Sequence, residues 1–244
     1  MQKVKIILSY DGSRFDGFAV QKGNANTVSN RLYKVFKSVG IYEKFNAAGR
    51  TDKGVHATYQ VIDIKIPFFW EKRLDYLKKI LNEKLFPSIF IKNMELVCDD
   101  FHSRFSAKKR VYRYILSFDD RDPFKAKYVT FLKKKLNKEL MQTAIKEFVG
   151  IYDFEYFKKS KGGTTNYIRE IFDTKYYEYK NYGIFYFCAN GFLRSQVRMM
   201  VDFLLKIDKS ILTIHQLQRQ LMKKDIYSRS LAPANGLYLA KVKY

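Results

Sequence analysis

The sequence predicts an α+β protein whose two halves each follow the order β-α-β-β-α-β. Apolar residues alternate in some segments and recur every three or four residues in others, which distinguishes strands from helices. The same order of elements occurs twice in 244 residues, of which 47% are hydrophobic, enough to bury a sizeable core. This is the order of the split β-α-β, ferredoxin-like arrangement. We therefore expect two mixed, largely antiparallel sheets with a cleft between them.

The first half alternates strands with two amphipathic helices. One helix begins at Val28 and repeats apolar residues at helical spacing up to Val39, and Gly40 ends it. Near the middle of this half, Ile62, Ile64 and Ile66 share one face of a strand. The elements expected here are strands at 4–10, 45–48, 60–66 and 89–97 and helices at 28–39 and 70–85.

The second half repeats this order. Asn181-Tyr182-Gly183 has the composition of a hairpin turn between two strands, and Gly150 ends a helix. The elements expected here are strands at 111–117, 168–179, 184–189 and 236–242 and helices at 135–149, 192–207 and 214–223. We place the boundary near Ser106, where a basic run begins, so the expected domains are residues 1–105 and 106–244.

The chain is strongly basic, with 46 Lys and Arg against 24 Asp and Glu and a net charge of +22. Residues 1–122 hold 23 basic and 14 acidic side chains and residues 123–244 hold 23 and 10, so the charge belongs to the folded body and not to a tail. Aromatic residues make up 17% of the chain. A basic, aromatic-rich body favours a nucleic acid as partner, because cations neutralise phosphates and rings stack on bases. The alternative is a Lys-rich composition with no ligand behind it.

Several classes of protein are disfavoured by what the sequence lacks. No apolar run reaches the length of a membrane span, and the N-terminus runs into a strand pattern unlike a signal peptide, so we expect a cytoplasmic protein without membrane contact. Cys98 and Cys188 form no CxxC pair, and with three histidines in the chain we expect no metal site. Neither GxGxxG nor GxxxxGK[ST] occurs, which disfavours nucleotide-driven chemistry.

The most unusual segment is the loop Gly49-Arg50-Thr51-Asp52-Lys53-Gly54, between two expected strands. Its glycines permit backbone angles that other residues resist, so the residues between them can form a tight, projecting loop. The cations of Arg50 and Lys53 favour the ionised form of the Asp52 carboxylate, which suits a nucleophile or a base. The alternative is a turn aspartate that serves its own backbone.

Two further segments combine basic and aromatic residues. In the strand that begins near residue 110, Arg110, Tyr112 and Tyr114 fall on one face, where a tyrosine can stack on a base. The alternative is that both tyrosines are half-buried strand residues. The segment from Asn190 to Val201 opens a helix with Arg194 and Arg198 on one side. Such an arginine either pairs with a buried carboxylate or lies exposed with its stem on apolar surface.

Together these segments resemble the TruA-type tRNA pseudouridine synthases. The loop Gly49–Ala57 is similar to the family signature GRTDAGVHA, with Lys53 in place of alanine. The other matching segments follow the family's order along the chain: Tyr10–Ser13, Phe101–Tyr114 (FHxRFSAxxRxYxY), Phe192–Val201 (ending in VRxxV) and Leu231–Leu237 (AxxxGL).

The resemblance implies the pseudouridine synthase fold and an isomerase that converts uridine to pseudouridine at positions 38, 39 and/or 40 of the tRNA anticodon stem-loop. It implies no cofactor and commonly a homodimer. Motif by motif, Asp52 matches the catalytic aspartate, Tyr112 the tyrosine stacked on the flipped base and Arg198 the catalytic-site arginine that pairs with the aspartate. The further candidates for substrate binding, chosen for their charge and position, are Arg50, Lys108, Lys109 and Arg110.

This chemistry agrees with the residues present. Isomerisation breaks the N1–C1′ bond, turns the uracil and joins C5 to C1′. No water attacks, so one carboxylate suffices where a hydrolase needs two. Asp52 can attack the sugar carbon or remove a sugar proton, and the sequence leaves both open. Two other functions also stay open: a non-catalytic RNA-binding protein, and a synthase acting on another RNA.

Four positions depart from the family pattern. Phe18 replaces a tryptophan near the first loop, and Tyr152 replaces the histidine of a GxHDF segment. Gln196 replaces the methionine before the VR pair, and Asp202 replaces the glycine four residues after Arg198. None of them is a proposed catalytic residue.

Overall fold

The computed structural model describes residues 1–23, 25–159 and 165–244, and the chain divides into two compact units. Unit 1 comprises residues 1–108 and 238–244, and unit 2 comprises residues 109–237. The expected domains divide the chain at 105/106, whereas the units divide it at 108/109 and the last strand returns to unit 1. Both units combine helices with a largely antiparallel sheet, so the predicted α+β class is confirmed.

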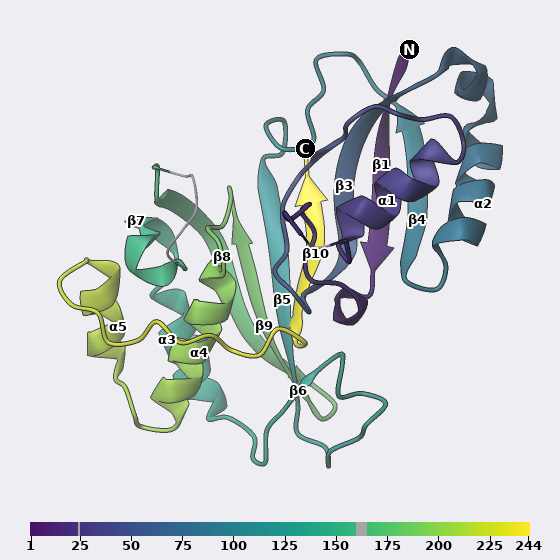
Figure 1. The fold of residues 1–244 in the computed structure, drawn as a ribbon. Helices are drawn as coiled ribbons and strands as arrows, with labels where there is room; N and C mark the ends of the chain where they lie inside the picture. The colour runs from purple at the N-terminus through teal and green to yellow at the C-terminus, as the bar shows by residue number, and fades with distance from the viewer. Residues whose placement is uncertain (24, 160–164) are drawn as a thin grey trace. The chain divides into compact units, whose positions relative to one another are not determined.

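Unit 1 is built around the antiparallel strand order β4-β1-β3 (Figure 1), and the short strand β2 also pairs antiparallel with β3. The C-terminal strand adds to the same β3 in parallel, pairing Tyr238 with His56. Before β10, the strands and helices of unit 1 follow one another as β1, α1, β2, β3, α2 and β4, which confirms the order β-α-β-β-α-β predicted for this half. Its elements are β1 (Gln2–Tyr10), α1 (Val28–Lys37), β2 (Asn46–Ala47), β3 (His56–Ile66), α2 (Leu74–Leu85), β4 (Ile89–Leu96) and β10 (Leu237–Lys243), with 3-10 turns at Gly12–Arg14 and Phe68–Arg73.

Local sequence explains the helices of unit 1. The Thr27 side chain accepts a hydrogen bond from the Asn30 amide and caps α1, whose predicted apolar face is buried. Helix α2 begins four residues later than predicted because residues 68–73 form a 3-10 turn, with Phe68 and Phe69 exposed. Strand β3 begins earlier than predicted, at His56, and residues 60–64 are buried on both faces.

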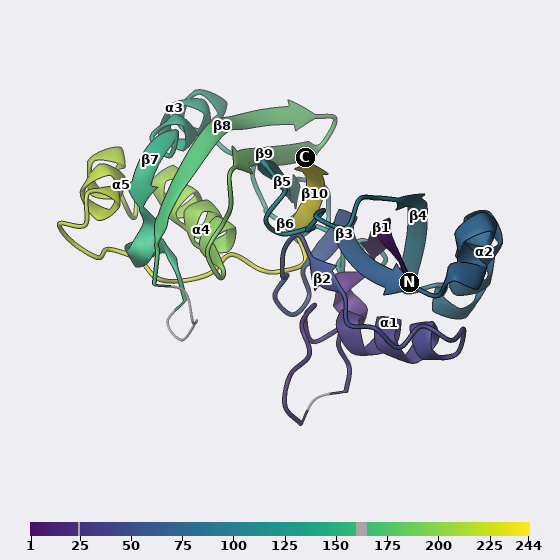
Figure 2. The ribbon, with the colours of Figure 1, turned by 90° about the horizontal axis from the view of Figure 1, so that it is seen from above.

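Unit 2 contains the antiparallel strand order β5-β9-β8-β7, with β6 parallel to β5. Figure 2 shows β7 and the β8–β9 hairpin side by side. The short strands β6 and β7 were not predicted. The elements are β5 (Lys109–Ser117), β6 (Thr130–Phe131), α3 (Lys138–Lys146), β7 (Gly150–Asp153), a 3-10 turn (Phe154–Phe157), β8 (Ile168–Tyr179), β9 (Tyr182–Ala189), α4 (Gln196–Asp208) and α5 (Ile214–Leu221).

Several predicted boundaries in unit 2 are wrong. The hairpin turns at Lys180 and Asn181, because Tyr179 already pairs with Tyr182 and Lys180 adopts the left-handed conformation at φ 54°. Helix α3 begins only after Asn137, whose side chain accepts from the Leu140 amide. Helix α4 begins at Gln196, so Arg194 lies outside the helix and does not share a helical face with Arg198.

The core of unit 2 is aromatic. Phe148 lies edge-on to Phe157, with ring centroids 5.6 Å apart, and also contacts Phe187. Phe157 in turn contacts Phe203 of α4. The two pairs of Phe148 are edge-to-face and add about 0.5–1.5 kcal/mol each beyond the area they bury, and the tilted Phe157–Phe203 pair links the cluster to α4.

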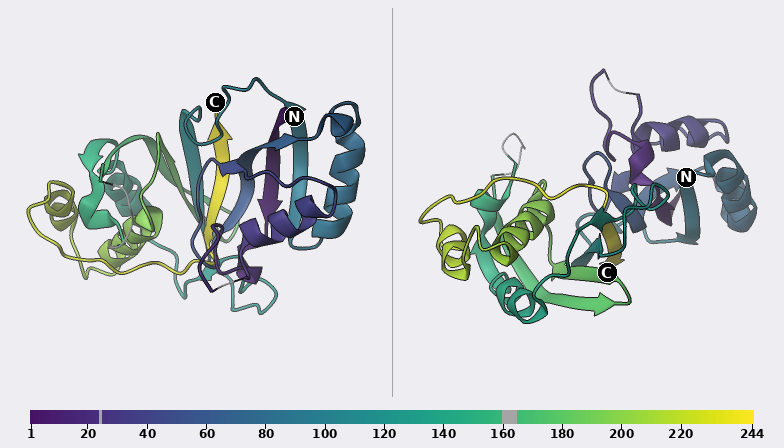
Figure 3. Two further views of the ribbon diagram at one scale, coloured as in Figure 1. Left: turned by 45° about the horizontal axis from the view of Figure 1, so that its top comes forward. Right: turned by 90° about the horizontal axis from the view of Figure 1, so that it is seen from below.

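Residues 222–236, here called the strap, have no regular secondary structure and run alongside α4 (Figures 1 and 3). The first part of the strap is anchored by Gln220, a completely buried residue of α5. The Gln220 side chain accepts from the amides of Tyr227 (2.7 Å) and Ser228 (3.1 Å) and donates to the Ser228 carbonyl (2.9 Å). One side chain thus takes the place of the backbone partners that an irregular segment lacks.

Within the described ranges, each helix is too short or too polar to span a membrane.

Candidate active site

The loop that carries Asp52 joins β2 to β3 in unit 1 and is anchored through Thr51. The buried Tyr10 and Thr51 hydroxyls are hydrogen-bonded at 2.7 Å, and the Thr51 carbonyl accepts from the Phe18 amide at 3.0 Å. At the start of the loop, the Gln60 side chain donates to the Gly49 carbonyl at 2.9 Å. These contacts hold the loop by both backbone and side chain on either side of Arg50.

The chain after β1 passes close beneath this loop, and two glycines make the approach possible. A Cβ on Gly12 would lie 2.0 Å from the Val55 carbonyl oxygen, a distance that no side chain tolerates. Gly17 adopts φ +113°, and a Cβ there would lie 3.1 Å from the Thr51 carbonyl oxygen. Phe18, where the family has tryptophan, is buried next to the Tyr10 ring.

His56 forms a second layer behind the loop. Its Nδ1 accepts from the Gly12 amide at 3.0 Å and lies 3.5 Å from the Asp11 carboxylate. The imidazole is buried and stacks on the Tyr238 ring with centroids 4.7 Å apart. Strand β10 therefore contributes to the support of the Asp52 loop within unit 1.

Asp52 is itself partly exposed, between exposed Arg50 and exposed Lys53. Its carbonyl accepts from the Val55 amide at 3.1 Å, which closes a tight turn that Gly54 completes at φ +78°. The Lys53 ammonium forms an ion pair with Asp16 at 2.7 Å. The loop thus holds the partly exposed Asp52 on a firmly anchored backbone.

In unit 2, the two tyrosines of β5 differ in their surroundings. The Tyr114 side chain is completely buried, and its hydroxyl contacts Thr130 Oγ1 at 2.7 Å and donates to the Pro233 carbonyl at 2.9 Å. Burial raises the pKa of Tyr114 far above its ordinary value, so the hydroxyl stays protonated. Tyr112 lies edge-on to Phe192 at 5.2 Å and is 9% exposed. Tyr114 is therefore structural.

Arg198 is held by the strap. Its Nε donates to the Ala232 carbonyl at 2.7 Å, and the Ala232 amide donates to the Arg198 carbonyl at 3.1 Å. Two residues earlier, the Gln196 side chain accepts from the Leu193 amide at 2.7 Å and stabilises the entry into α4, where Ser195 has φ +60°. The guanidinium is thus oriented by a fixed backbone carbonyl.

The other charged candidates are distributed over both units. Lys108 is exposed at the end of unit 1, where its amide donates to the Lys243 carbonyl. In unit 2, the Lys109 ammonium lies 4.8 Å from the centroid of the Phe172 ring, and Arg110 donates to the Asn190 carbonyl at 2.6 Å. Arg50 and Asp52 belong to unit 1, and Tyr112 and Arg198 belong to unit 2.

The supporting residues were missed at the level of sequence. Thr51, His56 and Gly12 belong to sequence motifs that resemble those of the family, yet nothing in those motifs reveals which atoms they contact. Tyr10 is separated from its partner Thr51 by 41 positions. Ala232 contributes only backbone atoms to Arg198, and a backbone contact leaves no signature in residue type.

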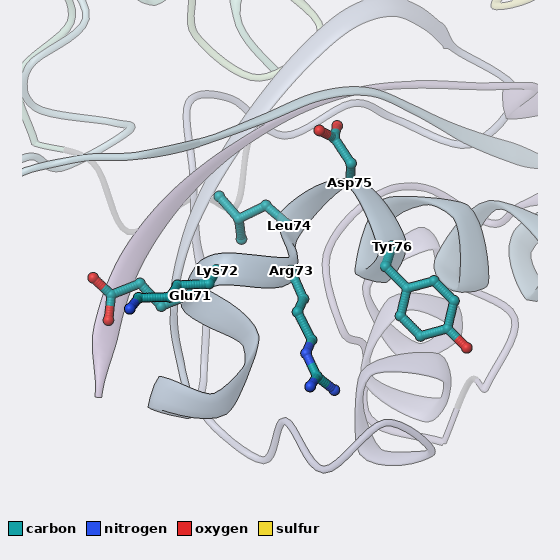
Figure 4. Close-up of a pocket in the computed structure, with 6 residues that line it drawn as sticks. All are labelled: Glu71, Lys72, Arg73, Leu74, Asp75 and Tyr76. Carbon is teal, nitrogen blue, oxygen red and sulfur yellow. The ribbon is translucent and has the colours of Figure 1, made fainter.

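A surface hollow at the beginning of α2 contains none of the predicted site residues (Figure 4). Its volume is about 470 Å³, and it is lined by Glu71, Lys72, Arg73, Leu74, Asp75 and Tyr76. In the described part of the chain, no three His, Cys, Asp or Glu side chains gather in a way that could hold a metal ion.

Comparison with known proteins places these features in one family. Residues 144–244 match the family described as tRNA pseudouridine synthase. The tRNA pseudouridine synthase A of Helicobacter hepaticus is 42% identical over the full length of both chains, and that of Campylobacter jejuni serotype O:2 is 43% identical over the same coverage. The enzyme of that name from Limosilactobacillus reuteri is 38% identical over the whole of this chain and 97% of its own.

Among solved structures, a chain from the crystal structure of a Cbf5-Nop10-Gar1 complex aligns with 95% of this chain and 50% of its own. The TM-score is 0.37 and the identity is 11%, values too low to bear on the fold.

The full-length relatives define a pseudouridine synthase, an isomerase that acts on tRNA. The chain belongs to the tRNA pseudouridine synthase A family, as its resemblance to the TruA-type enzymes predicted.

Replacing Tyr10 by Phe removes the buried hydroxyl that holds Thr51. We expect the free energy of unfolding to fall by about 1–3 kcal/mol, because Thr51 loses its buried partner, and we expect slower pseudouridine formation on tRNA because the Asp52 loop is less firmly held. The measurements are denaturant unfolding and product formation, with Tyr42→Phe, at a side chain 71% exposed, as the matched control. Equal behaviour of the two variants would contradict the anchoring role of Tyr10.

Proposed function

We propose that the enzyme isomerises uridine to pseudouridine at positions 38, 39 and/or 40 of the tRNA anticodon stem-loop, with Asp52 as its catalytic group. The observation that carries this proposal is the Asp52 loop. Its motif resembles the family signature, and the loop is held by Tyr10, Phe18 and Gln60 while Asp52 stays partly exposed.

In the proposed reaction the N1–C1′ bond breaks, the uracil turns without leaving, and C5 bonds to C1′. C5 then loses its proton and N1 gains one, so the product is an isomer of the substrate. Asp52 acts either by attacking C1′ or by removing a proton from the sugar, and both routes need the ionised carboxylate. The detached uracil must be retained, which requires a site that holds the base while its bond to the sugar is open.

Tyr112 and Arg198 are proposed to complete the site. Tyr112 stacks on the flipped base, and its edge-on contact with Phe192 keeps the ring in place for that role. Arg198 pairs with Asp52. A guanidinium has five N–H donors, so an arginine that uses Nε on the Ala232 carbonyl can present its terminal nitrogens to a carboxylate.

The basic residues are proposed to bind the RNA backbone. Flipping a stacked base costs a few kcal/mol, which phosphate contacts can offset. Arg50 is exposed beside Asp52, and Lys108, Lys109 and Arg110 follow one another at the change from unit 1 to unit 2. We further propose that the enzyme is a cytoplasmic homodimer, as the resemblance implies.

Tritium release from tRNA that carries 5-tritiated uridine tests the reaction and its position together, because pseudouridine formation expels the hydrogen at C5. In separate transcripts, the uridine at position 38, 39 or 40 is replaced by another nucleotide. Each replacement should remove only the tritium release that comes from that position. Release that survives replacement of all three would contradict the proposed positions, although the isomerase activity itself would stand.

Asp52→Asn is expected to lower single-turnover tritium release by more than about a thousandfold, since the amide can neither attack nor accept a proton. The Kd for tRNA should stay within about twofold, because a partly exposed carboxylate adds no attraction to phosphate. Asp75→Asn, at a side chain that is 100% exposed, is the matched control and should keep the wild-type rate. Substantial turnover by Asp52→Asn would refute the assignment.

Replacing Lys108 and Lys109 together by Gln is expected to weaken tRNA binding and to flatten its salt dependence. Each lost phosphate contact lowers the slope of log K against log salt by about 0.7–0.9, so two contacts lower it by about 1.4–1.8. The control is the same replacement of Lys133 and Lys134, two consecutive lysines that are also exposed. A slope equal to that of the control would show that Lys108 and Lys109 do not contact phosphates.

A further inference from the structure

Helix α4 and the strap are joined by a regular series of polar contacts. Lys206 donates from Nζ to Ser228 Oγ at 2.8 Å, and Asp202 accepts from Ser230 Oγ at 2.5 Å. The series ends with the bond of 2.7 Å from Arg198 Nε to the Ala232 carbonyl. Positions four apart on the helix thus meet positions two apart on the strap.

This correspondence follows from the dimensions of the backbone. Four residues of α-helix rise about 6.0 Å, and two residues of extended chain span about 6.6 Å. Side chains four apart also lie on one face of a helix, as alternate residues do along an extended segment. The two segments can therefore lie antiparallel with every contact in register.

The side chains in the series select one register. A strap shifted by two residues one way would set apolar Ile226 against the Lys206 ammonium. A shift the other way would set Ala232 against the Asp202 carboxylate, which would then lack a hydroxyl donor. Ser228 and Ser230 are thus the strap residues that suit an anion and a cation one helical turn apart.

Asp202 and Lys206 form a compact cluster with the two serines. The two charged groups lie 3.1 Å apart, and the two serine hydroxyls lie 2.9 Å apart. Lys206 also donates to Ser230, and Ser228 Oγ donates to Asp202 at 3.3 Å. The two charged side chains are only 28% and 18% exposed, so these charge-assisted bonds are stronger than those of a solvated surface pair.

The cluster is connected to Arg198 through a short stretch of strap. Two residues after Ser230, the Ala232 backbone exchanges two hydrogen bonds with Arg198, and the Pro233 carbonyl accepts from the buried Tyr114 hydroxyl. Asp202 occupies the position where the family pattern has glycine. Glycine has no side chain that could accept from the serine hydroxyls, as the Asp202 carboxylate does.

We propose that Asp202 is a positioning residue for the isomerase reaction: with Lys206 it fixes the register of the strap, and the strap in turn holds Arg198 where it can pair with Asp52. This inference rests on the role of Arg198 given under Proposed function.

The test is a double-mutant cycle on the full-length enzyme, with single-turnover tritium release and tRNA Kd as separate readouts. Asp202→Ala is expected to slow turnover on the order of tenfold, while the Kd stays within about twofold. Asp202→Asn, which keeps an oxygen for the serine hydroxyls, should recover part of the loss. Asp208→Ala on the same helix is the control, since its carboxylate accepts from the Asn137 amide and not from the strap.

The decisive comparison is made in an Arg198→Ala background. If Asp202 acts through Arg198, adding Asp202→Ala to Arg198→Ala slows turnover no further. If the double variant is slower than Arg198→Ala by the full factor that Asp202→Ala causes alone, the inference is overturned while the role of Arg198 stays intact. An Asp202→Ala rate equal to that of Asp208→Ala would have the same consequence. A wild-type rate for Arg198→Ala would instead contradict the proposed function on which the inference depends.

Ser230→Ala provides a second variant should Asp202→Ala fold poorly. This substitution removes the Ser230 hydroxyl, which donates to Asp202 at 2.5 Å, from an exposed position on the strap. Like Asp202→Ala, it should slow turnover in the wild-type background and have no further effect in Arg198→Ala. A Ser230→Ala rate equal to wild type, measured on folded protein, would also overturn the inference.

Discussion

The reciprocal hydrogen bonds between Arg198 and Ala232 are the constraint around which unit 2 is arranged. The Arg198 side chain donates to the Ala232 carbonyl while the Ala232 amide donates to the Arg198 carbonyl, so helix and strap fix each other. An arginine side chain loses roughly 2 kcal/mol of rotamer freedom when it is ordered. Because the bond to Ala232 already orders part of the side chain in the folded protein, less of that freedom remains to be lost when the guanidinium binds an anionic group.

The Asp52 loop in unit 1 is likewise held by hydrogen bonds to residues distant in the sequence. Thr51 is held through its hydroxyl by Tyr10 and through its carbonyl by the Phe18 amide, and the absence of a Cβ at Gly12 lets the underlying chain reach Val55. The backbone of the neighbouring Asp52 is therefore held while the residue stays partly exposed. Each unit thus holds one of the two charged side chains of the proposed site on a backbone restrained by hydrogen bonds from outside its own segment, and such restraint favours a preorganised site.

Sequence reasoning reached the fold class, the order of elements in unit 1 and the Asp52 motif, because periodicity and glycine spacing are local signals. It failed where a local signal competed with a distant one. Gly183 suggested the hairpin turn, yet cross-strand pairing moved that turn to Lys180 and Asn181. The apolar run from Phe192 predicted an earlier helix, but the left-handed Ser195 and the bond from the Leu193 amide to the Gln196 side chain delay it. The contacts of Ala232 and Tyr10 were invisible because they join positions 34 and 41 residues from their partners.

The central claim is that Arg198 works as a guanidinium held at Nε and used at its terminal nitrogens. Its most direct test is the single-turnover rate of Arg198→Lys on unmodified tRNA. Lysine keeps the positive charge but carries all its donors on one nitrogen, so it cannot hold one nitrogen on the Ala232 carbonyl and present a separate planar pair of nitrogens to a carboxylate. We predict a rate close to that of Arg198→Ala with tRNA affinity unchanged. A rate close to wild type would show that charge alone is needed and would contradict this account.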